Sequence, residues 1–105
     1  MGSSDEFGSK ILYMGSKGNL TLEEIADLIA AGDDECINHF LRTVQSTIAA
    51  THSRLHVQAV KRLVVNFDII RGYIKPVDYP RKHEIEQAFT NLISYSKHEL
   101  QSKLH

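Results

Sequence analysis

The sequence predicts a small all-α fold, a mainly antiparallel bundle of four helices with a flexible N-terminal arm. Apolar residues recur every three or four positions along three stretches, which is the spacing of one face of a helix. The chain has 105 residues, 42% of them hydrophobic and 24% charged, as expected of one globular domain. The three stripes are Ile37, Phe40, Leu41, Val44 and Ile48; Val57, Val60, Leu63, Val64, Phe67 and Ile70; and Ile85, Phe89, Leu92, Ile93, Leu100 and Leu104.

The N-terminal segment is expected to lie outside the helical domain. Residues 1–9 are typical of vector-derived sequence, because Glu6-Phe7 and Gly8-Ser9 are dipeptides that two common cloning sites encode. Residues 10–19 combine a short apolar run with a glycine-rich turn, which predicts an extended arm. Residues 20–105 are expected to form a single helical domain.

The start of the first helix, over residues 21–31, is the clearest local signal in the chain. Thr21 and Glu24 have the spacing of a capping box, in which each side chain accepts a hydrogen bond from the other residue's backbone N–H. Gly32 follows as a left-handed cap at the C-terminal end, and Asp33 is placed to cap the next helix.

The second and third helices are predicted over residues 34–52 and 54–73. No glycine or proline separates them, so a single helix over 34–73 is the alternative, and its length would favour an elongated dimer. We favour a break near His52, with Ser53 as the cap of the third helix.

The last helix is predicted over residues 80–103. Pro76 and Pro80 place a loop before it, because two prolines four apart do not fit inside a helix.

Charge is unevenly distributed along the chain. Residues 1–36 hold eight acids and two bases, a net charge of −6, whereas residues 37–105 hold ten bases and five acids, a net charge of +5. One interpretation is attraction between the two parts of the same chain. The other is a basic face for an anionic partner, or head-to-tail contact between copies.

No motif for catalysis, a cofactor or a metal is present. Cys36 lies near His39 but lacks an orienting third group, so we expect a small buried side chain rather than a nucleophile. His52 and His56 have a spacing that can hold zinc, but no acidic ligand is in register. We expect all six histidines to be unpaired surface residues, and the protein not to be an enzyme.

Residues 20–29 resemble the first helix of bacterial helix-turn-helix DNA-binding domains, with a threonine cap and the Ile25-Ala26 pair. The resemblance implies a DNA-binding regulator that uses residues 20–43, with Cys36–Arg42 as the recognition helix. Acids at residues 33–35 oppose this, because carboxylates repel DNA phosphates.

The favoured hypothesis is a non-enzymatic interaction or regulatory module that binds protein and associates with itself as a homodimer. With no apolar run long enough to span a membrane and a single cysteine, we expect a cytoplasmic location without a membrane. The predicted contact surface joins the third and last helices, where the apolar stripes are wider than a monomer core requires and are flanked by bases and tyrosines. Its residues are Lys61, Arg62, Val65, Ile69, Arg71, Tyr73, Tyr79, Ile93 and Tyr95.

Overall fold

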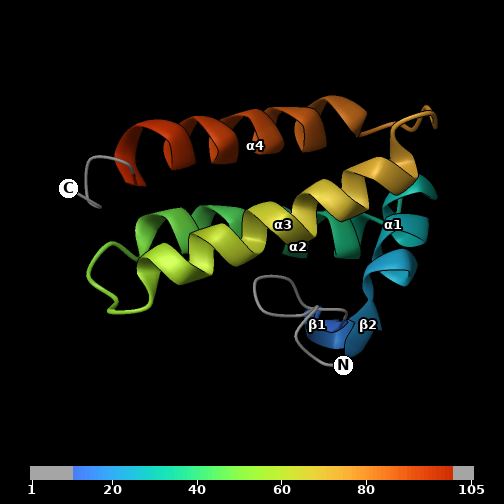
Figure 1. Cartoon of the computed structure of the whole chain (residues 1–105). Coiled ribbons are helices and arrows are strands. Elements are labelled where there is room, and N and C mark those ends of the chain that lie inside the picture. Colours follow the sequence, from blue (N-terminus) through green and yellow to red (C-terminus); the bar gives the residue numbers. More distant parts are fainter. Residues whose placement is uncertain (1–10, 101–105) are drawn as a thin grey trace, which may run out of the picture.

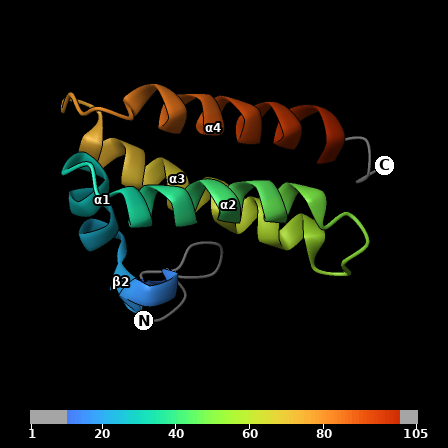
Figure 2. The same ribbon diagram turned by 180° about the vertical axis from the view of Figure 1, so that it is seen from behind.

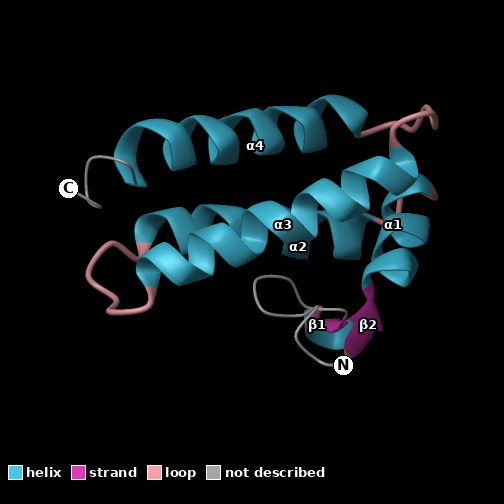
Figure 3. Ribbon diagram, in the orientation of Figure 1, coloured by secondary structure: helices cyan, strands magenta, loops and turns pink. Residues whose placement is uncertain are grey.

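A computed structural model describes residues 11–100 of the chain, with side chains described through residue 98, and confirms the predicted four-helix architecture (Figures 1 and 3). Residues 1–9, taken above as vector-derived, lie outside the described residues, as do the side chains of Leu100 and Leu104. The helices are α1 (Leu22–Ala30), α2 (Asp34–Ala49), α3 (His56–Ile74) and α4 (Lys82–Tyr95), and a π-helical turn, η3 (Ser96–Leu100), continues α4.

The three long helices lie side by side and alternate in direction. α2 and α3 run antiparallel next to each other, and α4 lies along both of them, antiparallel to α3 (Figures 1 and 2). The short α1 packs against α3 and α2 at the end of the bundle where α3 terminates. The outer side of α3 faces the viewer in Figure 1, and no other described helix covers it there.

The predicted arm over residues 10–19 is extended within the described part, but it is folded onto the domain rather than free. Strand β1 (Ile11–Tyr13) pairs antiparallel with β2 (Asn19–Thr21), and a 3₁₀ turn, η2 (Gly15–Lys17), joins them. Met14 is buried in the core. Met14, the partly buried Leu12 and Leu20, and the ion pair of Lys17 with Asp33 attach the hairpin to the helices.

The caps predicted for α1 and α2 are confirmed. The Thr21 hydroxyl accepts from the Glu24 N–H at 3.1 Å, and the Glu24 carboxylate accepts from the Thr21 N–H at 2.8 Å. Gly32 has φ +80°, and the N–H of Asp33 bonds the carbonyl of Leu28, which together form a Schellman ending. The Asp33 carboxylate then accepts from the Cys36 N–H at 2.9 Å and caps α2.

The predicted break between α2 and α3 is confirmed, and the alternative of one helix over 34–73 is wrong. Residues 50–55 form a turn that reverses the chain. The prediction for Ser53 needs correction, because the residue before α3 is Leu55 and no side chain caps this helix. The Ser53 hydroxyl instead accepts from the Leu55 N–H at 3.1 Å, within the turn itself.

The core is built around three phenylalanines, one from each long helix. The ring of Phe67 lies 4.5 Å from that of Phe40 and 5.2 Å from that of Phe89, measured between centroids. Phe40 and Phe67 are fully buried, whereas Phe89 is half-buried at the edge. The apolar side chains that surround them include Ile25, Ile29, Ile37, Val60, Ile70, Ile85 and Leu92.

The Asp33 carboxylate joins the hairpin to α2 and is the basis of a pH prediction. Its bond from the Cys36 N–H, followed by its contact with Lys17 at 3.0 Å, lowers the pKa of this carboxyl below the usual value. A lowered pKa stabilises the folded chain above the unfolded-state pKa, and the effect is lost as pH falls through the folded-state pKa. We therefore expect Asp33→Asn, which keeps a cap acceptor, to lower the free energy of unfolding above about pH 5 and progressively less in more acidic solution.

Urea unfolding across a pH series measures this difference. Asp27→Asn is the matched control, because Asp27 is exposed and makes no ion pair within residues 11–98. If the free energies of unfolding of wild type and Asp33→Asn differed by the same amount at every pH, this result would contradict a lowered pKa of the Asp33 carboxyl.

Candidate functional site

Three of the residues predicted to bind a partner form a continuous apolar surface on α3. Val65, Ile69 and Tyr73 are 37%, 42% and 51% exposed. They are spaced four residues apart, so they follow one side of the helix. We call these three residues the outer ridge of α3. Large apolar side chains exposed in series are typical of a contact surface.

One end of the outer ridge borders the start of α1. Ile69 and Tyr73 line a hollow of about 360 Å³ together with Thr21, Leu22 and Glu23. The Glu23 side chain is exposed, and its carboxylate is the acidic group at this end. Sequence reasoning missed these α1 residues, because only the tertiary packing of α1 on α3 brings them to the ridge.

The other end of the outer ridge is basic. Lys61 and Arg62 lie one turn before Val65, and both are exposed. Lys61 and Val65 line a second hollow of about 360 Å³, together with Val64 and Ser96. Neither base makes an ion pair within residues 11–98. The predicted basic rim is therefore present beside the apolar residues.

Arg71 and Ile93 were predicted for the same surface but lie in a different groove, between α3 and α4. They border a hollow of about 380 Å³ that also contains Phe89. The Arg71 guanidinium lies 4.7 Å from the centre of the Phe89 ring and 3.5 Å from the Glu86 carboxylate. Because these contacts engage it within the chain, Arg71 helps join α3 to α4 and is not part of the outer ridge.

Tyr79 is buried, so it does not belong to an exposed surface as predicted. The loop that carries it packs against the turn between α1 and α2. Pro80 lies close to Gly32, and Arg81 contacts the Asp34 carboxylate at 3.2 Å. Burial raises the pKa of the Tyr79 hydroxyl to about 12. Tyr79 therefore packs the loop onto the domain instead of contributing to a partner-binding surface.

Tyr95 and His56 form a polar contact that the sequence did not predict. The Tyr95 hydroxyl and His56 Nε2 are 2.6 Å apart, and the two rings meet edge to face. His56 is buried, so the expectation that all six histidines lie unpaired on the surface is wrong for this one. His52 lies in the turn before α3, so the two histidines do not share a helix face, and residues 11–98 contain no cluster that could hold a metal.

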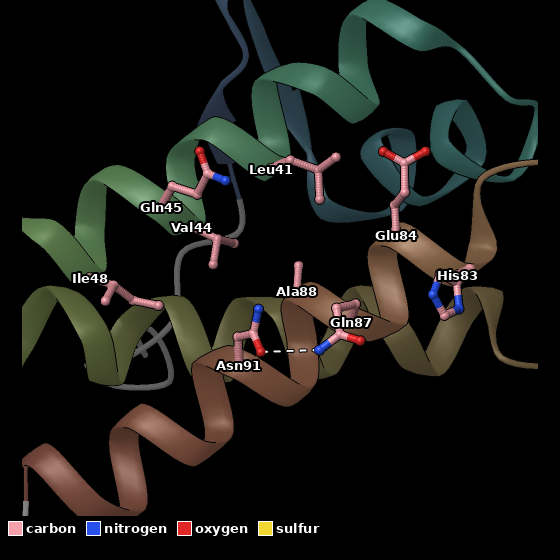
Figure 4. Close-up of a pocket in the computed structure, with 9 residues that line it drawn as sticks. All are labelled: Leu41, Val44, Gln45, Ile48, His83, Glu84, Gln87, Ala88 and Asn91. Atoms are coloured by element: carbon pink, nitrogen blue, oxygen red, sulfur yellow. Dashed lines mark hydrogen bonds between the residues drawn. The ribbon is translucent and has the colours of Figure 1, made fainter.

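A further groove lies between α2 and α4 (Figure 4). Its volume is about 300 Å³, with an apolar floor and polar residues along α4. In Figure 4 Gln87 and Asn91 point toward each other, and the Gln87 amide donates to Asn91 at 3.1 Å. The apolar lining residues are Leu41, Val44, Ile48 and Ala88, and the polar ones are Gln45, His83, Glu84, Gln87 and Asn91.

Of the two titratable side chains that line the groove between α2 and α4, one is held in its ionised form. The Glu84 carboxylate accepts two hydrogen bonds from Arg81, at 2.7 and 2.8 Å, and these lower its pKa below the ordinary value. A carboxylate held ionised in this way is a poor proton donor near neutral pH. His83, the other titratable lining residue, is exposed on α4.

The region that resembles a helix-turn-helix presents mostly carboxylates. Asp33, Asp34 and Glu35 lie at the start of α2, where they contact Lys17 and Arg81. Of the candidate base-reading side chains, Asn38 and Arg42 are exposed, whereas His39 is half-buried with its ring against that of Tyr13. This surface offers few donors to bases and little positive charge to phosphates.

Comparisons with protein families, with curated proteins and with solved structures found no match for this chain. Among the described helices, none combines the length and the apolar character needed to cross a membrane. The surface geometry therefore carries the functional argument.

The environment of Cys36 predicts an unreactive thiol. Burial, followed by repulsion from Asp33, raises the pKa of Cys36 to about 11, so almost no thiolate exists near neutral pH. We expect a thiol reagent such as Ellman's reagent to leave the folded chain unmodified at pH 8 and to modify it rapidly in urea. Rapid modification of the folded chain would contradict the buried position.

The contact between Tyr95 and His56 predicts a specific loss of stability. Tyr95→Phe removes the hydroxyl and leaves the buried imidazole nitrogen without this partner, which costs about 1–3 kcal/mol. Tyr73→Phe is the matched control, because Tyr73 is half exposed and its hydroxyl makes no hydrogen bond within residues 11–98. Urea unfolding gives the free energy of unfolding of both variants. Equal values for the two would contradict a stabilising contact between Tyr95 and His56.

Proposed function

We propose that this domain is a non-enzymatic protein-interaction module that associates through the outer ridge of α3, with itself as the preferred partner. The observation that carries the proposal is the row of exposed apolar residues Val65, Ile69 and Tyr73, spaced four apart along α3. Burial of such side chains stabilises association by about 25 cal/mol per Å² of apolar area.

The bases at the start of the ridge support the same proposal. Lys61 and Arg62 are exposed beside Val65, where they orient and accelerate an encounter with an acidic surface.

The single cysteine is free and buried, which fits the reducing compartment expected from the cysteine count. A cytoplasmic location is therefore part of the proposal.

The alternative function is DNA binding through residues 20–43. The two proposals differ in their response to salt, because affinity for DNA falls steeply as salt rises, whereas apolar association changes little. Retention on heparin that is lost steeply with salt would favour DNA binding. The carboxylates at the start of α2 are the reason that we prefer protein association.

Charged substitutions on the ridge test the proposal. We expect the average molecular mass of the wild-type protein to rise with concentration. Val65→Glu and Ile69→Glu are each expected to raise the dissociation constant on the order of 100-fold, because each dimer would bury two carboxylates. Sedimentation velocity over a concentration series measures the dissociation constants. Circular dichroism is expected to show unchanged helix content, because both residues are exposed in the single chain.

Val77→Glu is the matched control for Val65→Glu. Val77 is also 37% exposed, but it lies in the loop before α4 and away from the ridge. We expect this variant to associate as the wild type does. A chain that remains monomeric at every concentration, or an equal effect of Val77→Glu, would refute association through the outer ridge.

A further inference from the structure

The outer ridge of α3 has opposite charges at its two ends. Lys61 and Arg62 precede its apolar residues, and Glu23 lies beside Ile69 and Tyr73 at the far end. Residues 61 and 73 are about 18 Å apart along a helix that rises 1.5 Å per residue. The ridge therefore has bases at one end and an acid at the other, with apolar side chains and the exposed Asp68 of α3 between them.

We propose that the outer ridge binds the outer ridge of a second copy across a two-fold axis, with the two α3 helices antiparallel. This inference rests on the proposed function and specifies its geometry. An axis that passes near the level of Phe67 brings Val65 of one copy to Ile69 of the other. The same rotation brings the Arg62 end of each copy to the Glu23 end of the other.

Charge selects this arrangement over a parallel one. Parallel helices would place Arg62 next to Arg62 and Glu23 next to Glu23, and contacts between like charges are unfavourable. The antiparallel arrangement forms two contacts of opposite charge per dimer.

The charges at the ridge are available for contacts between copies. Glu23, Lys61 and Arg62 are exposed, and none of them makes an ion pair within residues 11–98. The carboxylates at the start of α2 differ, because Asp33 and Asp34 already contact Lys17 and Arg81. Glu23 therefore has no ion-pair partner within residues 11–98, and it lies next to exposed apolar side chains of the ridge.

A second copy fits better than an unrelated protein because the surface is complementary to itself. An isologous contact uses the same patch twice and closes at the dimer. The ridge supplies only a few large side chains per copy, so we expect a weak dimer, with a dissociation constant in the micromolar range or above.

Charge exchange between two variants tests the antiparallel pairing. Glu23→Arg and Arg62→Glu each place two like-charge contacts in a homodimer, so we expect each variant to raise the dissociation constant on the order of tenfold. In an equimolar mixture, both contacts of the heterodimer regain opposite charges. We therefore expect the mixture to associate within about threefold of the wild-type constant.

Matched controls are Asp78→Arg in the loop before α4 and Arg42→Glu on α2, which make the same charge changes at exposed positions outside the ridge. We expect both to associate as the wild type does. Sedimentation velocity gives the constants and the mass of the complex, and circular dichroism checks the helix content of each variant.

Three outcomes would overturn the inference: a mixture no tighter than the single variants, an equal effect of Asp78→Arg, or assemblies larger than a dimer. If Val65→Glu and Ile69→Glu still abolish association, the outer ridge remains the contact surface and only the antiparallel pairing fails. If these two variants have no effect either, the proposed function fails with it.

Discussion

The packing of Phe67 between Phe40 and Phe89 is the contact on which the rest of the structure depends. It joins α2, α3 and α4 at one point, with ring centroids 4.5 and 5.2 Å apart. It also fixes the rotation of α3 about its own axis. A helix turns about 100° per residue, so once Phe67 and Ile70 point into the core, Ile69 must point away from it. The core and the outer ridge are therefore two consequences of the same packing.

Polar contacts hold the two ends of the pair formed by α3 and α4, whose first residues lack side-chain caps. At one end, the His56 imidazole meets the Tyr95 hydroxyl, where α3 begins and α4 ends. At the other end, Tyr79 is buried in the loop between the two helices, and Arg81 contacts the start of α2. These contacts link elements that are distant in sequence.

The four helices were predictable because the apolar stripes repeat over several turns, and because each cap of α1 and α2 joins two residues that lie three apart in the sequence. The errors have a common cause, which is dependence on residues far away in the chain. Tyr79 and His56 look like surface residues locally, yet both are buried, and His56 contacts Tyr95 at the end of α4. The hairpin is similar, since the burial of Met14 among helices that follow it decides whether the arm folds back.

The candidate surface was predictable only where a single helix defines it. Val65 and Ile69 follow from the width of the stripe on α3, but the acidic end of the ridge belongs to α1 and needs the tertiary fold. The outward orientation of the Glu23 side chain nevertheless has a local origin. The capping box starts α1 at Leu22, and the burial of Leu22 and Ile25 turns the intervening Glu23 outward. The same short motif that begins the first helix thus sets the carboxylate beside the apolar ridge, which gives the surface its two unlike ends.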